Sequence, residues 1–141
     1  MSQYKLPNSF RYTKDLLLEY RDTAMKNAEK LLMEADLLYK HGHLERTYFL
    51  SVAAIEETGK AAIIHLSLGR NLQDSAVTSK IKSSLESHTE KINMAFHSSI
   101  TSHNNIQDEI MDIVELMVDL SNGREPSMYT DLNYENMQIL S

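Results

Sequence analysis

The sequence predicts an all-α fold, an antiparallel helical bundle of four main helices with a C-terminal extension. Apolar residues recur at steps of three and four over long stretches, as on the buried face of an amphipathic helix. Only four Gly and two Pro occur in 141 residues, too few for the many turns of a sandwich or barrel. A chain of this length forms one domain by default, so we expect a single helical domain over residues 1–141.

The first long helix is expected from about Phe10 to Lys40, after an irregular lead-in over residues 1–9. Asn8 or Ser9 is the candidate N-cap, because a short polar side chain there can accept a hydrogen bond from the first helical turn. Asn27 borders the apolar stripe, and an amide in that position more often serves packing than function. The stripe itself consists of Leu17, Tyr20, Ala24, Ala28, Leu31, Ala35 and Leu38.

The central helix is expected over about residues 44–68. Within it, the stretch 48–66 is almost wholly apolar, apart from Glu56, Glu57 and Lys60 at its middle. A solvated helix spreads its charges along one face, so charges inside an apolar run indicate a polar site on a buried helix. Glu56 and Lys60 have the i, i+4 spacing of a helical ion pair. Because unpaired buried charge is costly, we also expect partners from another helix.

Two further helices are expected, over about residues 79–102 and 106–121, before a largely irregular tail over about residues 123–141. In the first of these two helices, His88 falls within the apolar stripe. Lys91 lies one turn further on, at the edge of the stripe. These two side chains are therefore the natural partners for the carboxylates of the central helix.

We expect one polar cluster made of Glu56, Glu57, Lys60, His88 and Lys91. It has the groups for acid–base chemistry, but ion-pair networks give the same pattern, so a structural and a functional cluster both remain open. Metal-binding bundles usually supply carboxylates from a second helix, whereas this one offers a histidine and a lysine, which repels cations. We therefore expect no metal and no other cofactor. The sequence also has no Cys, no Gly-x-Ser-x-Gly and no Gly-rich phosphate loop.

The charge distribution limits the partners. A net charge of -6 argues against broad nucleic-acid binding, and we expect no DNA partner. Residues 92–123 contain five carboxylates and no Lys or Arg, so we do not expect this segment to contact phosphate. The N-terminus lacks an apolar signal region, and no apolar run reaches the roughly 18 residues of a membrane span. We expect a cytoplasmic protein without membrane contact.

The segment HGHLERTYFLSVAAIEETGKAAI resembles the AbiV branch of the HEPN superfamily, which comprises abortive-infection proteins of bacteria. The resemblance rests on an Ala-rich helix with the pattern A-x-E-E-x-G-K, followed by H-x-x-K and then R-x-x-x-x-Y-x-D, and it covers most of the chain. The matching positions are Asn27 and Ala28 in the first helix, Ala54, Glu56, Glu57, Gly59 and Lys60 in the central helix, then His88 and Lys91, and finally Arg124, Tyr129 and Asp131.

The resemblance implies an HEPN-like all-α bundle that forms a homodimer. It also implies a phage-defence effector that blocks host growth by acting on RNA or the translation machinery, with a phage protein or an antitoxin as a further partner. Many members of the superfamily are metal-independent RNases with an R-x4–6-H motif, which this sequence lacks.

Whether the chain is an enzyme therefore stays open. If it cleaves RNA, His88 would have to work with Lys60 or Lys91, one group acting as general base on a ribose 2′-hydroxyl and the lysines stabilising the phosphorane charge. The alternative is a non-catalytic helical module for dimerisation or protein docking, in which the cluster is a structural network of ion pairs.

Overall fold

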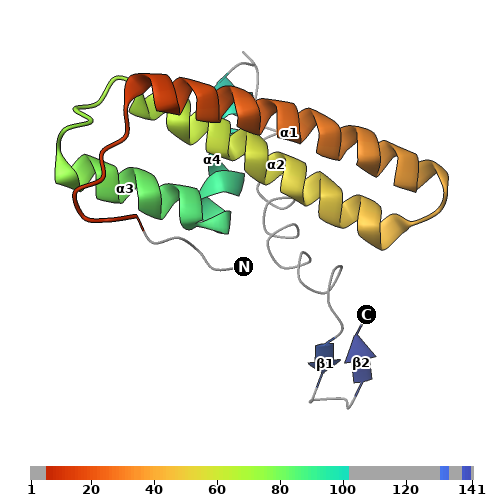
Figure 1. The fold of residues 1–141 in the computed structure, drawn as a ribbon. Helices are drawn as coiled ribbons and strands as arrows, with labels where there is room; N and C mark the ends of the chain where they lie inside the picture. Colours follow the sequence, from red (N-terminus) through yellow and green to blue (C-terminus); the bar gives the residue numbers. More distant parts are fainter. Residues whose placement is uncertain (1–5, 102–130, 134–137, 141) are drawn as a thin grey trace.

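The computed structural model describes residues 6–101, 131–133 and 138–140, with side chains over residues 6–98. The described helices are α1 (Lys14–Lys40), α2 (Leu44–Ser67), α3 (Ser75–Glu86) and α4 (His88–Thr101). Figure 1 shows α1 and α2 side by side as a long antiparallel hairpin, with α3 below α2 and α4 turning away from α3. The predicted all-α bundle is confirmed.

The N-cap of α1 is Thr13 and not Asn8 or Ser9, so the helix begins at Lys14 and not at Phe10. The Thr13 hydroxyl accepts a hydrogen bond from the Leu16 amide at 3.1 Å, which satisfies one of the free donors of the first turn. The predicted stripe is confirmed where it meets α2, because its buried members are Leu17, Ala24, Ala28 and Ala35.

The segment before α1 is packed against the helices. Tyr12 is buried, and its ring meets that of Phe10 edge to face at 5.0 Å between centroids. Arg11 donates a hydrogen bond from Nε to the carbonyl oxygen of Gln73 at 3.0 Å. This segment is therefore tied to the turn that joins α2 to α3.

A glycine ends α1 and opens the turn to α2. Gly42 has a φ of 79°, a conformation that side-chain-bearing residues rarely adopt. His41 caps the end of α1, with its Nδ1 at 2.8 Å from the carbonyl oxygen of Leu37. The two helices therefore reverse direction within a few residues and can pack along their length.

The central position of α2 is visible in its contacts, since it packs against α1, α3 and α4. Near its C-terminal end, Ile63 and Ile64 belong to a larger apolar cluster with residues of α1 and α3. Near its N-terminal end, Val52 forms a smaller apolar cluster with Ile92 of α4. Between these two clusters along α2 lies the charged stretch that the sequence singled out.

The prediction of a single helix over about residues 79–102 is wrong, because the helix is interrupted at Ser87. Ser87 has extended backbone angles, with φ -84° and ψ 114°, and ends α3. Its hydroxyl then accepts a hydrogen bond from the Glu90 amide at 3.2 Å, so Ser87 acts as an N-cap for α4. Ser87-His88-Thr89-Glu90 is a Ser-x-x-Glu pattern of helix N-termini, which is the signal that could have located this break.

The start of the preceding helix also differs from the prediction. α3 begins at Ser75, capped by Asp74, whose carboxylate accepts from the Ala76 amide at 2.8 Å. The helix predicted over residues 106–121 lies outside the described residues. In the C-terminal extension, β1 (Asp131–Asn133) and β2 (Gln138–Leu140) pair antiparallel, with Leu132 opposite Ile139. This short pairing was not predicted.

No helix within the described ranges combines the length and apolar character that crossing a lipid bilayer requires.

Candidate functional site

The centre of the candidate site is the carboxylate of Glu56, which lies in the middle of α2 with its side chain only 8% exposed. Its Oε2 atom is 2.8 Å from Nδ1 of His88 and 3.6 Å from Nζ of Lys91. Two basic side chains of α4 thus converge on one carboxylate oxygen of α2. The partners that the sequence proposed for the central carboxylates are confirmed at Glu56.

The two basic groups occupy different environments. His88 is the first residue of α4 and Lys91 lies one turn further on, so both side chains leave the helix on the side that meets α2. The Lys91 side chain is 10% exposed, whereas the His88 side chain is 56% exposed. The Glu56–Lys91 pair is therefore sealed inside the fold, while the imidazole reaches the surface.

Hydrogen bonding to Glu56 sets the orientation of the imidazole. A carboxylate accepts, so Nδ1 of His88 is the donor and the neutral ring carries its free acceptor at Nε2. His88 was predicted within the apolar stripe of one long helix, but the break at Ser87 makes it the first residue of α4, where it meets α2 and is also exposed. The result is an exposed base held by a buried acid.

Gly59 explains why α4 can come close enough for these contacts. A Cβ atom at Gly59 would fall on the backbone carbonyl of Lys91. The backbones of α2 and α4 therefore touch at this point, one turn from Glu56 along α2. The missing side chain of Gly59 is what allows this close approach of the two helices.

Glu57 and Lys60 form a second polar group on the adjacent face of α2. They are ion-paired to each other at i, i+3, with side chains 17% and 18% exposed. The Lys60 ammonium also lies 5.8 Å from the centre of the Tyr20 ring on α1. The predicted i, i+4 pair of Lys60 with Glu56 is wrong, because Glu56 pairs with residues of α4 and Lys60 pairs with Glu57. The expected single cluster is therefore two groups.

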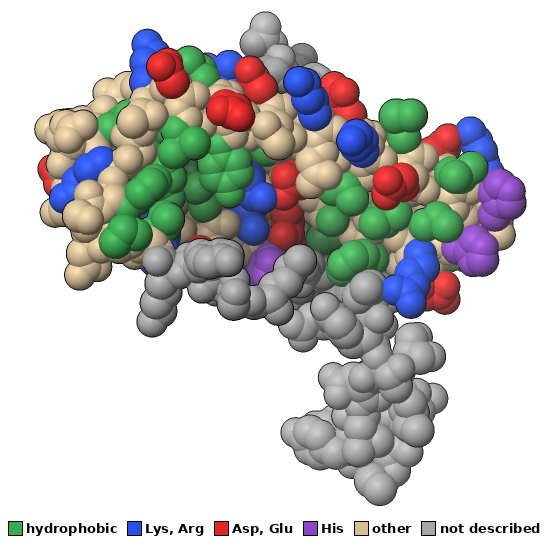
Figure 2. Space-filling model, viewed as in Figure 1, with side chains coloured by type: hydrophobic (Ala, Val, Ile, Leu, Met, Phe, Trp, Pro, Cys, Tyr) green, Lys and Arg blue, Asp and Glu red, His purple; other side chains and the backbone are tan. Residues whose placement is uncertain are grey.

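Figure 2 shows the molecule in space-filling form. Acidic and basic side chains meet near the middle of this face, with hydrophobic side chains on either side. This alternation agrees with the two apolar clusters of α2 and the charged stretch between them.

The other family-like positions contribute less to the site. Asn27 is exposed on α1, so the expectation of a packed amide is wrong. Arg124 and Tyr129 lie outside the described residues. Asp131 begins strand β1, but its side chain is outside the described part.

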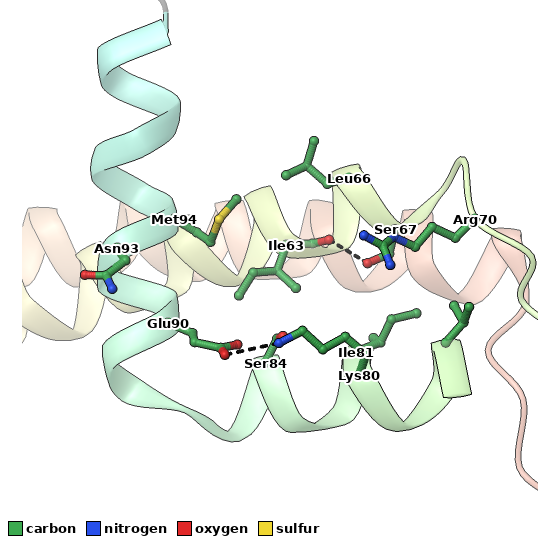
Figure 3. A pocket seen from close by; sticks show the side chains of 11 residues that line it. Ile63, Leu66, Ser67, Arg70, Lys80, Ile81, Ser84, Glu90, Asn93 and Met94 are labelled. Atoms are coloured by element: carbon green, nitrogen blue, oxygen red, sulfur yellow. Dashed lines mark hydrogen bonds and ion pairs between the residues drawn. The ribbon is translucent and has the colours of Figure 1, made fainter. Parts of the chain in front are cut away.

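A cavity of about 280 Å³ lies apart from these charges, between α2, α3 and α4. Figure 3 shows it between a row of side chains from α2 and a row from α3, closed at one end by α4. At its edge, a hydrogen bond from Ser84 and the Lys80 ammonium hold the pKa of Glu90 below its usual value. The sequence did not predict this cavity, because its wall comes from three helices and from the break at Ser87.

Within the described residues, no group of three or more His, Asp or Glu side chains is placed to hold a metal ion.

Comparison with known families agrees with the motif pattern. The sequence model described as AbiV, of the HEPN group, matches residues 16–139. This range includes the whole of α2, α3 and α4 and therefore all five candidate residues. No curated protein and no solved structure gives a significant match to the chain.

Proposed function

This chain belongs to the AbiV family of HEPN proteins, and on that basis we propose that it is an abortive-infection effector that arrests host growth by acting on RNA or on the translation machinery. The observation that carries the chemical part of the proposal is the Glu56–His88 pair, an exposed imidazole held by a buried carboxylate at 2.8 Å. A cytoplasmic homodimer is part of the same proposal.

The arrangement of this pair suits a general base. Enzymes that remove a proton from a hydroxyl use an accessible imidazole whose other nitrogen is held by an orienting group. Here Glu56 fixes Nδ1, and Nε2 is the nitrogen that would receive the proton of a ribose 2′-hydroxyl. Glu56 would act as a positioning residue, since it is buried and meets the imidazole rather than the substrate.

A second candidate function is supported by the two lysines. Lys60 is paired with Glu57, and Lys91 is buried against Glu56, so neither is available to stabilise a phosphorane. This favours a module that docks a protein, such as a phage protein, an antitoxin or a component of the translation machinery, without cleaving RNA. In that case Glu56, Lys91 and His88 hold α4 on α2.

The test is inducible expression of the full chain in bacteria, with and without phage infection. Wild type is compared with His88→Gln, which removes the base, and with His97→Gln, a matched control on an exposed histidine of the same helix. Growth, RNA integrity and incorporation of labelled amino acid are followed together. A folded His88→Gln protein, checked by circular dichroism, is required for the comparison.

RNA cleavage that occurs with wild type and His97→Gln but not with His88→Gln supports the catalytic form of the proposal. Growth arrest with intact RNA, equal in all three proteins, contradicts it and supports docking. An absence of arrest with wild type, infected or not, contradicts the effector function itself.

A further inference from the structure

We propose that the cavity between α2, α3 and α4 binds a small carboxylic acid with an apolar body, in a site separate from the Glu56–His88 pair and beyond the effector function. The cavity of about 280 Å³ is near the lower limit of pockets that take small molecules. Its size therefore suits a compact ligand and not a macromolecular segment.

The floor of the cavity is apolar. Ile63 of α2 and Ile81 of α3 are 7% and 3% exposed, and both belong to the larger apolar cluster, against which Met94 of α4 also packs. These side chains come from three helices and meet around one space, as Figure 3 shows. An apolar ligand body would gain from leaving water there, since each buried methylene contributes about 0.8 kcal/mol.

The rim of the cavity carries charge that is only partly compensated. Lys80 is paired with Glu90 at 3.3 Å, so these two charges offset each other. Arg70, just beyond the end of α2, also lines the cavity, and within the described residues no carboxylate pairs with its guanidinium. The rim therefore has one positive charge that a ligand can neutralise.

This charge selects the head group of the ligand. A guanidinium forms two parallel hydrogen bonds with a carboxylate, which bears a single negative charge at neutral pH. A phosphate monoester bears about -1.5 to -2, which is more than the one uncompensated positive charge of the rim can neutralise. The rim therefore favours a carboxylate over a phosphate.

Hydrogen bonds fix the backbone of Arg70 at the rim of the cavity. Its amide donates to the carbonyl oxygen of Ser67 at 3.1 Å, and Ser67 is buried with its hydroxyl bonded to the Ile63 carbonyl at 2.7 Å. Figure 3 shows Arg70 and Ser67 together at the α2 side of the cavity, opposite Lys80 and Ile81 of α3. A ligand carboxylate bound to Arg70 thus leaves its apolar body over Ile63 and Ile81.

The test uses octanoate as the probe, with octanol and hexyl phosphate as the neutral and the more highly charged analogues. Binding to the full chain is measured by calorimetry, by the shift of the melting temperature, and by NMR chemical-shift changes at Ile63, Ile81 and Met94. The variant Arg70→Gln removes the charge at an exposed position. Arg70→Lys keeps the charge but not the two parallel N–H donors of the guanidinium. Lys30→Gln, an exposed change on α1, is the matched control.

We expect octanoate to bind wild type and Lys30→Gln equally, with the largest shifts at the cavity. Arg70→Gln should weaken the binding by about tenfold or more, with Arg70→Lys between the two. Equal binding to Arg70→Gln, equal binding of octanol, tighter binding of hexyl phosphate, or an absence of binding each overturns the proposal. None of these outcomes depends on growth arrest, so they are distinguishable from a failure of the effector function.

Discussion

The backbone carbonyl of Lys91 occupies the position where Gly59 would carry a Cβ atom. This contact brings the first turn of α4 against the middle of α2, and it places two basic side chains at the Glu56 carboxylate. The glycine of the E-E-x-G-K pattern is therefore a packing requirement of the same site to which its first glutamate belongs.

Gly59→Ala should lower the free energy of unfolding. The added methyl group meets backbone, which cannot rotate away, and overpacking of this kind costs about 1–3 kcal/mol or more. Alanine offsets about 1 kcal/mol of this through its higher helix propensity. Urea denaturation measures the difference. Gly69→Ala is the control, since a Cβ there meets nothing within 4 Å, and an equal effect of both changes would contradict the contact.

Glu56→Gln should destabilise the fold more strongly, because it leaves the Lys91 ammonium buried without its charged partner. Removing one member of a buried ion pair costs about 3–5 kcal/mol. The double change Glu56→Leu with Lys91→Met should recover much of this loss, since two apolar side chains replace two desolvated charges. The comparison is by urea denaturation, with Glu34→Gln on the exposed surface of α1 as the control. A double variant that is as unstable as Glu56→Gln would refute this explanation.

Glu90 should contribute stability that is lost at acidic pH. Hydrogen bonding by Ser84 and the charge of Lys80 lower the pKa of Glu90 in the folded state below its ordinary 4.5. The stabilisation is therefore present above pH 4.5 and is lost as the pH falls through the lower folded pKa. In thermal melts from pH 7 to pH 3, the melting temperature of Glu90→Gln should fall less than that of wild type. Parallel curves would show that this carboxylate does not contribute.

Tyr12 should contribute stability that is lost at alkaline pH. Burial first, and then the nearby Tyr20 and Glu86, raise the pKa of Tyr12 above 10.0. The folded state keeps the phenol neutral, so this stabilisation is complete below pH 10.0 and is lost as the pH rises through the folded pKa. Tyr12→Phe keeps the ring and should flatten the stability curve above that pH, as measured by urea denaturation. Tyr39→Phe, at a residue that is 62% exposed, serves as the control.

The sequence was sufficient for the α1–α2 hairpin, because its stripe of Leu17, Ala24, Ala28 and Ala35 repeats at helical steps and its turn contains Gly42. It was not sufficient for the pairing of Lys60. Glu56 and Glu57 both lie within reach of that lysine along the helix, and the choice depends on which face of α2 each neighbouring helix covers. That information belongs to the packing of three helices and not to the periodicity of one.

The environment of His88 was missed for a local reason. The helical spacing of apolar residues continues across the break at Ser87. The stripe over residues 81–96 therefore predicts one helix, although Ser87 has extended backbone angles. Only the cap of α4 marks the change of direction. The same break places α4 at the end of the cavity. Because the break at Ser87 was not predicted, neither the exposure of His88 nor the cavity could be predicted.

The segment before α1 shows that the packed core extends beyond the residues that the family model matches. The family match begins at residue 16, whereas the buried ring of Tyr12 and the packed side chains of Leu6 and Phe10 belong to the larger apolar cluster. A chain shortened to the start of the family match would lose Tyr12, Leu6 and Phe10 from this apolar cluster. Any truncation or fusion at this end should therefore retain residues 6–15 as part of the core.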